Sequence, residues 1–184
     1  MKPKILLIGA STGGPLLIKE LLLSLNYFNY TIVIAQHMKE EVLPFYIDDL
    51  KESLPFCIKA TPTISNFRGG EVIVCSQSTI LQKEYSTFKF VTNTDNQSYT
   101  PDINKLFNSF VPYANEFDIS ILILTGIGSD GIDGAYNLKK YRSKIIAQDK
   151  QNCAVYGMPK AAVEMGIVDK VQTLDEIKNY MKEL

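Results

Sequence analysis

Three polar residues of this sequence have the types that nucleophilic catalysis needs. Ser11 lies in the segment GASTG, which matches the G-x-S-x-G pattern in which glycines let a strand turn sharply into a helix and expose the serine hydroxyl. His37 is the one histidine of the chain, and Asp130 lies in the glycine-rich segment TGIGSDG. A serine hydroxyl becomes a nucleophile when an imidazole takes its proton, and an anion behind the imidazole holds its tautomer. These residues therefore predict acyl transfer by a Ser-His-Asp triad.

Each of the three residues follows an apolar segment that is predicted to be a strand. The predicted strands are residues 4–8, 31–35 and 119–124. The last is the most apolar, which predicts a place at the centre of the sheet. Strands that alternate with helices indicate an α/β fold, with a doubly wound, mostly parallel sheet and helices on both faces. In such sheets ligands bind beyond the carboxyl ends of the strands, so we expect Ser11, His37 and Asp130 to meet at that edge.

The rest of the chain completes this pattern as a single domain, residues 1–184. Pro15 suits the first turn of a helix whose positive N-terminus would favour negative charge near Ser11. Thr100 and Pro101 are predicted to open a middle helix, and Thr173 begins a capping box before the last one. The other predicted elements are helices over residues 41–54 (bent at Pro44), 132–141 and 174–184, strands over 71–75 and 144–147, and a hairpin of 80–82 with 88–91.

Composition narrows the classes of protein. The 184 residues are 46% hydrophobic and carry a net charge of −1, which is typical of a folded domain and predicts no nucleic-acid partner. The apolar runs are too short for a signal sequence or a membrane span, so we expect a cytoplasmic protein without direct membrane insertion. Cys57, Cys75 and Cys153 form no CxxC pair and are expected to be reduced thiols. The predicted chemistry needs no metal or organic cofactor.

Two other classes of function fit parts of the sequence. The glycine-rich segments around Ser11 and Asp130 are also typical of phosphate loops in a nucleotide-binding module. Dinucleotide sites, however, require an acidic residue at the end of the second strand, where Gln36 and His37 stand. A second alternative is a non-catalytic protein that docks on receptors or kinases. For Asp130 alone, the alternative is that its side chain only caps the helix after it. The order Ser, His, Asp along the chain argues against an α/β-hydrolase, which runs Ser, Asp, His.

Four segments together resemble one known family. The segments KILLIGASTGGP, AQHM, LTGIGSDGIDG and IIAQDKQNCAVYGMPKAAVEMGIVDKV, in this order, are similar to the catalytic domain of the chemotaxis receptor methylesterases, the CheB family. The resemblance covers nearly the whole chain. It implies a doubly wound parallel α/β fold and hydrolysis of glutamyl methyl esters on the cytoplasmic helices of methyl-accepting chemotaxis receptors. Many members of the family also deamidate receptor glutamines.

The resemblance also implies roles for individual residues. Ser11 is implied to be the nucleophile, His37 the base and Asp130 the acid that orients the imidazole. Thr12 matches the threonine beside the family's nucleophile, near the active centre. Ile127 stands where the family usually has methionine, and its backbone amide is implied to help to hold the oxyanion.

The chain departs from the family at several positions. Lys39 stands where a proline often follows the QHM, Thr100 replaces a common arginine, and residues 75–78 replace a Pro-Gly pair and a second histidine. We expect these changes to affect substrate contacts more than the triad. Most members carry a receiver domain ahead of the catalytic domain. Two residues separate Met1 from the first strand. This start favours an enzyme that lacks phosphorylation control in its own chain, rather than a sequence that was shortened.

Overall fold

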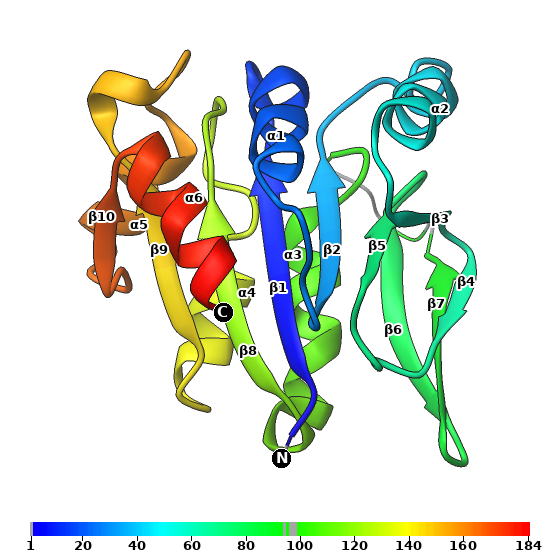
Figure 1. Ribbon diagram of the computed structural model, residues 1–184. Coiled ribbons are helices and arrows are strands. Elements are labelled where there is room, and N and C mark those ends of the chain that lie inside the picture. Colours follow the sequence, from blue (N-terminus) through cyan, green and yellow to red (C-terminus); the bar gives the residue numbers. More distant parts are fainter. Residues whose placement is uncertain (1, 94, 96–98) are drawn as a thin grey trace.

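Seven parallel strands form the main sheet in a computed structural model that describes residues 2–93, 95 and 99–184 (Figure 1). Short runs of β-branched and other apolar residues form these strands because both faces of the sheet are buried. β1 is the middle strand, with three strands on each side of it. In spatial order the strands are β10 (Lys170–Gln172), β9 (Lys144–Gln148), β8 (Asp118–Ile123), β1 (Lys4–Ala10), β2 (Thr31–Gln36), β5 (Glu71–Val74) and β3 (Cys57–Ala60).

Helices cover both faces of this sheet, so the predicted doubly wound α/β fold is confirmed (Figure 1). Alternate residues of β1 point into two separate cores: Leu6 and Ile8 pack with α1, α2 and α6, whereas Ile5 and Leu7 pack with α3, α4 and α5. The helices are α1 (Gly14–Leu23), α2 (Leu43–Ser53), α3 (Ile103–Phe110), α4 (Ile132–Lys139), α5 (Met158–Glu164) and α6 (Leu174–Glu183), with short 3-10 helices over Val111–Glu116 and Lys150–Asn152.

A second, antiparallel sheet of three strands lies beside α3. Its order is β4 (Thr63–Ser65), β7 (Thr87–Thr92) and β6 (Thr79–Glu84). The predicted hairpin is confirmed as the β6–β7 pair. Phe88 and Phe90 of β7 pack against Phe67, Phe110 and Phe117, and this aromatic cluster attaches the small sheet to the core around α3.

Two details of the predicted elements are wrong. Helix α2 begins at Leu43 with Pro44 in its first turn, so the proline helps to start the helix and does not bend it. The most apolar strand, β8, lies next to the centre of the sheet, which β1 occupies. The capping box at Thr173 is present as predicted.

The start of the middle helix also differs from the prediction. Thr100 and Pro101 precede α3, and the helix begins only at Ile103. Its cap is Asp102, whose carboxylate accepts a hydrogen bond from the Lys105 N–H at 2.8 Å. A carboxylate in this position satisfies an amide that the helix itself leaves free and lies at the positive end of the helix.

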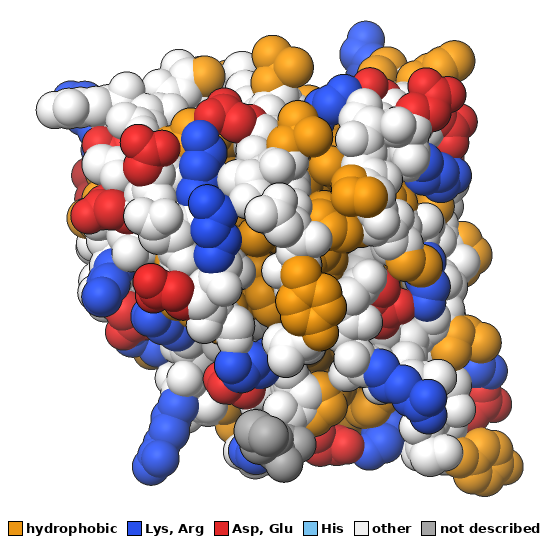
Figure 2. Space-filling view, in the orientation of Figure 1, with side chains coloured by type: hydrophobic (Ala, Val, Ile, Leu, Met, Phe, Trp, Pro, Cys, Tyr) orange, Lys and Arg blue, Asp and Glu red, His pale blue; other side chains and the backbone are white. Residues whose placement is uncertain are grey.

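The surface carries charges of both signs. On the face seen in Figure 2, Lys and Arg side chains are interspersed with Asp and Glu, and the exposed apolar side chains gather toward the middle of the view. Among the described residues, no helix combines the length and the apolar character that crossing a membrane requires.

Candidate active site

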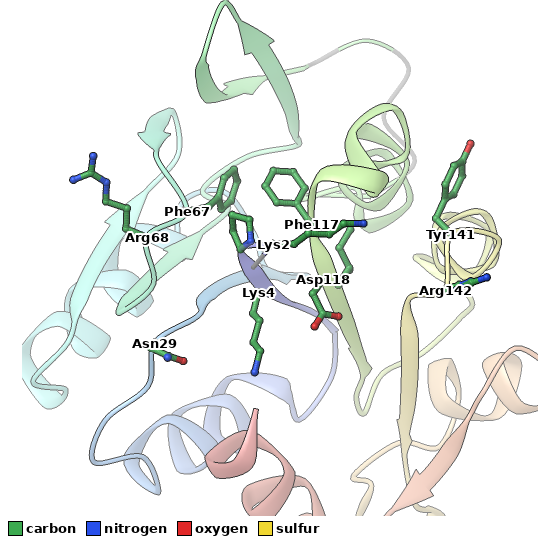
Figure 3. A pocket seen from close by; sticks show the side chains of 11 residues that line it. Lys2, Lys4, Asn29, Phe67, Arg68, Phe117, Asp118, Tyr141 and Arg142 are labelled. Carbon is green, nitrogen blue, oxygen red and sulfur yellow. The ribbon is translucent and has the colours of Figure 1, made fainter.

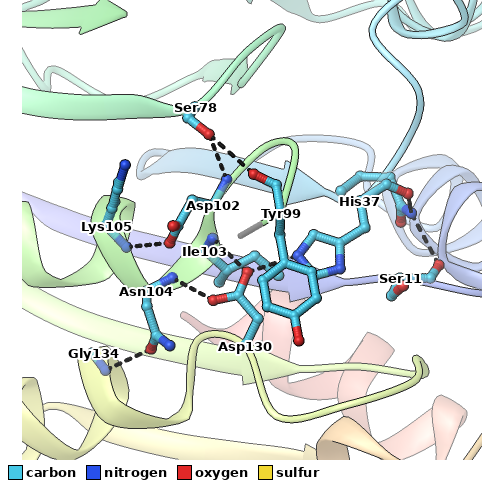
Figure 4. Close-up of polar contacts among 11 residues, drawn as sticks. Ser11, His37, Ser78, Tyr99, Asp102, Ile103, Asn104, Lys105, Asp130 and Gly134 are labelled. Carbon is cyan, nitrogen blue, oxygen red and sulfur yellow. Dashed lines mark hydrogen bonds and ion pairs between the residues drawn. The ribbon is translucent and has the colours of Figure 1, made fainter. Parts of the chain in front are cut away.

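The structure brings Ser11, His37 and Asp130 to one edge of the sheet. They follow the carboxyl ends of the three adjacent strands β1, β2 and β8. The His37 N–H donates to the Ala10 carbonyl at 2.9 Å, and the Ser11 N–H donates to the Thr125 carbonyl at 2.9 Å. Backbone bonds between neighbouring strands therefore hold the three loops side by side, and Figure 4 shows the side chains together.

A buried hydrogen bond joins His37 to Asp130. The distance from His37 Nε2 to Asp130 Oδ2 is 2.7 Å, and the two side chains are 11% and 1% exposed. An ionised carboxylate only accepts hydrogen bonds, so Nε2 must carry the proton of the neutral ring. Nδ1 is then the nitrogen that is free to accept a proton from another group.

Asp130 is in turn held by helix α3. Its Oδ2 accepts the Ile103 N–H at 2.8 Å and its Oδ1 accepts the Asn104 N–H at 2.9 Å (Figure 4). These amides belong to the first turn of α3, whose positive end stabilises a carboxylate. The alternative in which Asp130 only caps the helix after it is wrong, because α4 has no side-chain cap bond and follows Gly131.

The Ser11 turn is shaped by glycines. Gly13, with φ of 84°, occupies the left-handed region that glycine adopts easily, and it precedes the first residue of α1. Gly126 approaches so closely that a Cβ there would lie 2.5 Å from the Ser11 Cβ. Within the described residues, Ser11 Oγ makes no hydrogen bond to the imidazole. Such contacts are often long in enzymes without substrate and tighten when substrate binds.

Thr12 lies in this turn, directly after Ser11, and Ile127 follows Gly126, which contacts Ser11. Both are exposed, Ile127 to 65%. The Gly126 carbonyl accepts the N–H groups of Gly157 and Met158 at the start of α5, at 3.1 and 2.9 Å. Because a trans peptide places its N–H opposite its C=O, the Ile127 N–H points away from α5. Neither the Thr12 amide nor the Ile127 amide donates to another described residue.

Three further residues of the site were not predicted from the sequence. Tyr99 stacks flat on the imidazole of His37, with ring centroids 4.9 Å apart and an interplanar angle of 6°. The side chain of Gln36 donates to two backbone carbonyls of the site. The Thr125 hydroxyl donates to the Thr12 carbonyl at 2.8 Å. Gln36 and Thr125 stand beside the predicted residues in AQHM and LTGIGSDG, but their side-chain partners become visible only in the folded chain.

A second carboxylate lies close to the pair. Asp102 is buried at the N-terminus of α3, next to the amides that bind Asp130. Burial raises the pKa of Asp102, the Lys105 backbone bond opposes this rise, and the charge of Asp130 adds to it. Two acidic side chains therefore lie at the start of α3, and Asp130 is the one that binds His37.

Two hollows differ in their relation to this site. One of about 680 Å³ is lined by His37, Tyr99 and neighbouring residues of the loop after β2, so it adjoins the imidazole. Another of about 690 Å³ lies at the amino-terminal ends of the strands, at the opposite end of the sheet. Figure 3 shows Arg68 and Arg142 extending to opposite sides of this second hollow, so their charges do not converge on one anion. Among the described residues, no three His, Cys, Asp or Glu side chains gather to hold a metal ion.

Fold and site together define an α/β protein that carries the residue set of a serine hydrolase at the carboxyl edge of its sheet. The family model for CheB methylesterase matches residues 6–181. The chain therefore belongs to the CheB methylesterase family.

Curated relatives and a solved structure agree with this assignment. The chain is 31% identical over 177 residues to protein-glutamate methylesterase/protein-glutamine glutaminase 1 of Saccharophagus degradans, covering 95% of this chain and 48% of that protein. It is 32% identical over 182 residues to the enzyme of the same name from Borreliella burgdorferi, covering 97% and 47%. The chain thus spans about half the length of these relatives. The crystal structure of the Thermotoga maritima CheB methylesterase catalytic domain superposes with a TM-score of 0.84 at 25% identity, covering 100% of this chain and 99% of that one.

Proposed function

We propose that residues 1–184 form the catalytic domain of a protein-glutamate methylesterase, with Ser11 as nucleophile, His37 as base and Asp130 as the acid that orients it. The observation that carries this proposal is the buried His37–Asp130 hydrogen bond beside the Ser11 turn, in a chain of the CheB methylesterase family. The reaction is hydrolysis of a glutamyl methyl ester to a free carboxylate and methanol.

Proton transfer through His37 drives the proposed reaction. Nδ1 takes the Ser11 proton as Oγ attacks the ester carbonyl, and the resulting imidazolium donates through Nε2 to the Asp130 carboxylate. The imidazolium then returns the proton to the departing methoxide, so methanol leaves and an acyl-serine remains. A water molecule, activated by the same nitrogen, releases the glutamate and restores Ser11.

Backbone amides are the proposed donors to the oxyanion of the tetrahedral intermediate. The Ile127 N–H is available because it has no partner among the described residues and its peptide is fixed by α5 through the Gly126 carbonyl. The Thr12 N–H, next to the nucleophile, is available in the same way. One such fixed donor contributes roughly 3 kcal/mol to transition-state stabilisation.

The proposed substrates are methylated glutamates on the cytoplasmic helices of methyl-accepting chemotaxis receptors, and the proposed place of action is the cytoplasm. The names of the relatives support methyl esters of protein glutamates as substrates, and their second name supports deamidation of glutamine side chains, in which ammonia leaves in place of methanol. The hollow beside His37 and Tyr99 offers room for the substrate segment.

The nucleotide-binding alternative is disfavoured by the hydrogen bonds of the first loop. A phosphate loop binds its ligand through free backbone amides at the start of a helix. Here the Gly14 N–H donates to the Ser11 carbonyl at 2.8 Å, and the Ser11 N–H donates to Thr125. Two of the amides that a phosphate would need are therefore engaged within the protein.

Methanol release tests the proposal directly. The purified chain is incubated with receptor carrying isotopically labelled methyl esters, and volatile methanol is measured against the Ser11→Ala variant. Release by the wild type and loss of release in the variant are expected. Receptor binding without methanol release would refute the proposal in favour of a docking protein.

A further inference from the structure

The side chain of Gln36 connects the backbone of Ser11 to the backbone of His37. Its Nε2 donates to the Ser11 carbonyl at 2.9 Å and to the His37 carbonyl at 2.7 Å. The amide nitrogen has two hydrogens, and each meets one carbonyl. These two bonds, which we name the Gln36 bridge, join the residue that carries the candidate nucleophile to the residue that carries the candidate base.

The orientation of this amide follows from its partners. Both partners are carbonyl oxygens, which only accept hydrogen bonds, so the NH₂ group must face them. Gln36 Oε1 then points the other way, against Gly14 at the start of α1, where a Cβ would collide with it. This oxygen is buried and has no hydrogen-bond partner among the described residues.

A buried carbonyl oxygen without a partner destabilises a fold. An apolar side chain of similar size would avoid that cost at a position as buried as Gln36, which is 1% exposed. The polar side chain is therefore explained by what its nitrogen does, and both partners of that nitrogen belong to candidate catalytic residues. Its location supports this reading, because Gln36 pairs with Ala10 in the β1–β2 register, directly before Ser11.

We propose that Gln36 is a positioning residue, which sets the distance between Ser11 and His37 through the Gln36 bridge. In its catalytic part, this inference rests on the proposed function. The hydroxyl and the imidazole make no direct bond within the described residues, so their spacing depends on the backbones that carry them. Attack requires the two groups at hydrogen-bond distance, and a displacement of about 1 Å can lower a rate roughly 100-fold.

The Gln36→Met variant tests the proposal, because methionine has a similar size and shape but no N–H. Gln172→Met is the matched control, since Gln172 ends β10 at the sheet edge and also has a buried oxygen without a partner among the described residues. We expect Gln36→Met to lower kcat for methanol release about 10- to 100-fold with little change in KM. Labelling of Ser11 by a fluorophosphonate should slow in parallel, and Gln172→Met should stay within about twofold of the wild type. Equal kcat and equal labelling in the two variants would overturn the proposal.

Two measurements separate this inference from the proposed function and from a failure to fold. His37 is the one histidine, so imidazole NMR signals report its environment without ambiguity. These signals should move in Gln36→Met and stay in place in Gln172→Met.

In the wild type, the side-chain N–H groups of Gln36 should exchange with solvent far more slowly than those of the exposed Gln151. Equally fast exchange would show that the bridge is absent and would overturn the inference. Because this experiment uses the wild type, it decides the question even if Gln36→Met does not fold. A wild type that neither releases methanol nor reacts with fluorophosphonate would refute the proposed function and the catalytic part of this inference, while the exchange experiment would still decide the bridge.

Discussion

Replacement of Asp130 by asparagine separates catalysis from helix capping. The carboxylate accepts three hydrogen bonds: Oδ2 binds His37 Nε2 and the Ile103 N–H, and Oδ1 binds the Asn104 N–H. An asparagine has one acceptor oxygen in nearly the same shape. If that oxygen replaces Oδ2, the NH₂ group faces the Asn104 N–H and one bond is lost. If it replaces Oδ1, the Ile103 bond is lost and the NH₂ group donates to His37 Nε2, so the imidazole must carry its proton on Nδ1, where it cannot accept the proton of Ser11.

Each orientation leaves one backbone N–H of α3 without its acceptor, and this loss sets the expected effect on stability. Loss of one hydrogen bond to a charged group, with a buried N–H left without a partner, costs about 2–3 kcal/mol of unfolding free energy. A domain with a typical stability of about 5–15 kcal/mol remains folded. The expected effect on activity is larger, because the imidazolium loses the anion that stabilises it. The Asp-to-Asn change in the serine-protease triad lowers kcat by about 10⁴, equivalent to about 5 kcal/mol.

Both quantities are measured on the same preparation of Asp130→Asn. Methanol release gives the rate, and urea denaturation followed by circular dichroism gives the unfolding free energy. Asn104→Ala serves as a control, since it retains the backbone N–H that binds Asp130 but removes a side chain that accepts the Gly134 N–H. A variant Asp130→Asn that loses stability but keeps more than about a tenth of the wild-type rate would show that Asp130 only caps α3.

Three other predictions follow from the site and its surroundings. Ser11→Ala and His37→Ala should each lower methanol release by more than about 100-fold, with the thermal midpoint unchanged within a few degrees, because one general base contributes roughly 10²–10⁴-fold. Tyr99→Ala should lower kcat about tenfold, whereas Tyr99→Phe, which keeps the ring stacked on the imidazole, should stay near the wild-type rate. Burial alone would raise the pKa of Asp169, but hydrogen bonds from Lys139 and a backbone amide lower it overall. The contribution of Asp169 to the unfolding free energy is therefore complete above the unfolded pKa of about 3.9. It is lost as the pH falls through the lower pKa of the folded state. In urea titrations, Asp169→Asn should cost about 1 kcal/mol or less at pH 7, and this cost should shrink as the pH falls below the unfolded pKa.

The central strands were predictable from the sequence, whereas the edges of the sheet were not. β1, β2 and β8 are continuous apolar runs because helices bury both of their faces. The edge strands β3 and β10 are short and mostly exposed or half-buried, so their residues carry no apolar pattern. The start of α3 was misplaced for a local reason: Thr100 and Asp102 both suit a cap, and only the bond from Lys105 decides between them.

The candidate triad was predictable because Ser11, His37 and Asp130 have reactive side chains and each follows an apolar strand. Parallel strands that lie side by side place such residues at one edge, so strand prediction alone brings the three near each other. Tyr99 could not be found in this way, because it precedes α3 and reaches the imidazole only through tertiary packing. Gln36 contacts the site through backbone carbonyls, and that contact depends on the register between β1 and β2.

One feature of the fold couples its stability to the proposed chemistry. The carboxylate that orients His37 is the same group that satisfies the first amides of α3, and Asp102 satisfies the next one. Helix α3 packs through Phe107 and Phe110 into the core that also contains the aromatic residues of the small sheet. A change that loosens the small sheet therefore displaces α3, and with it the donors that hold Asp130 in place. We infer that the proposed activity requires this core as much as the triad, because the imidazole is oriented only while the start of α3 stays where it is.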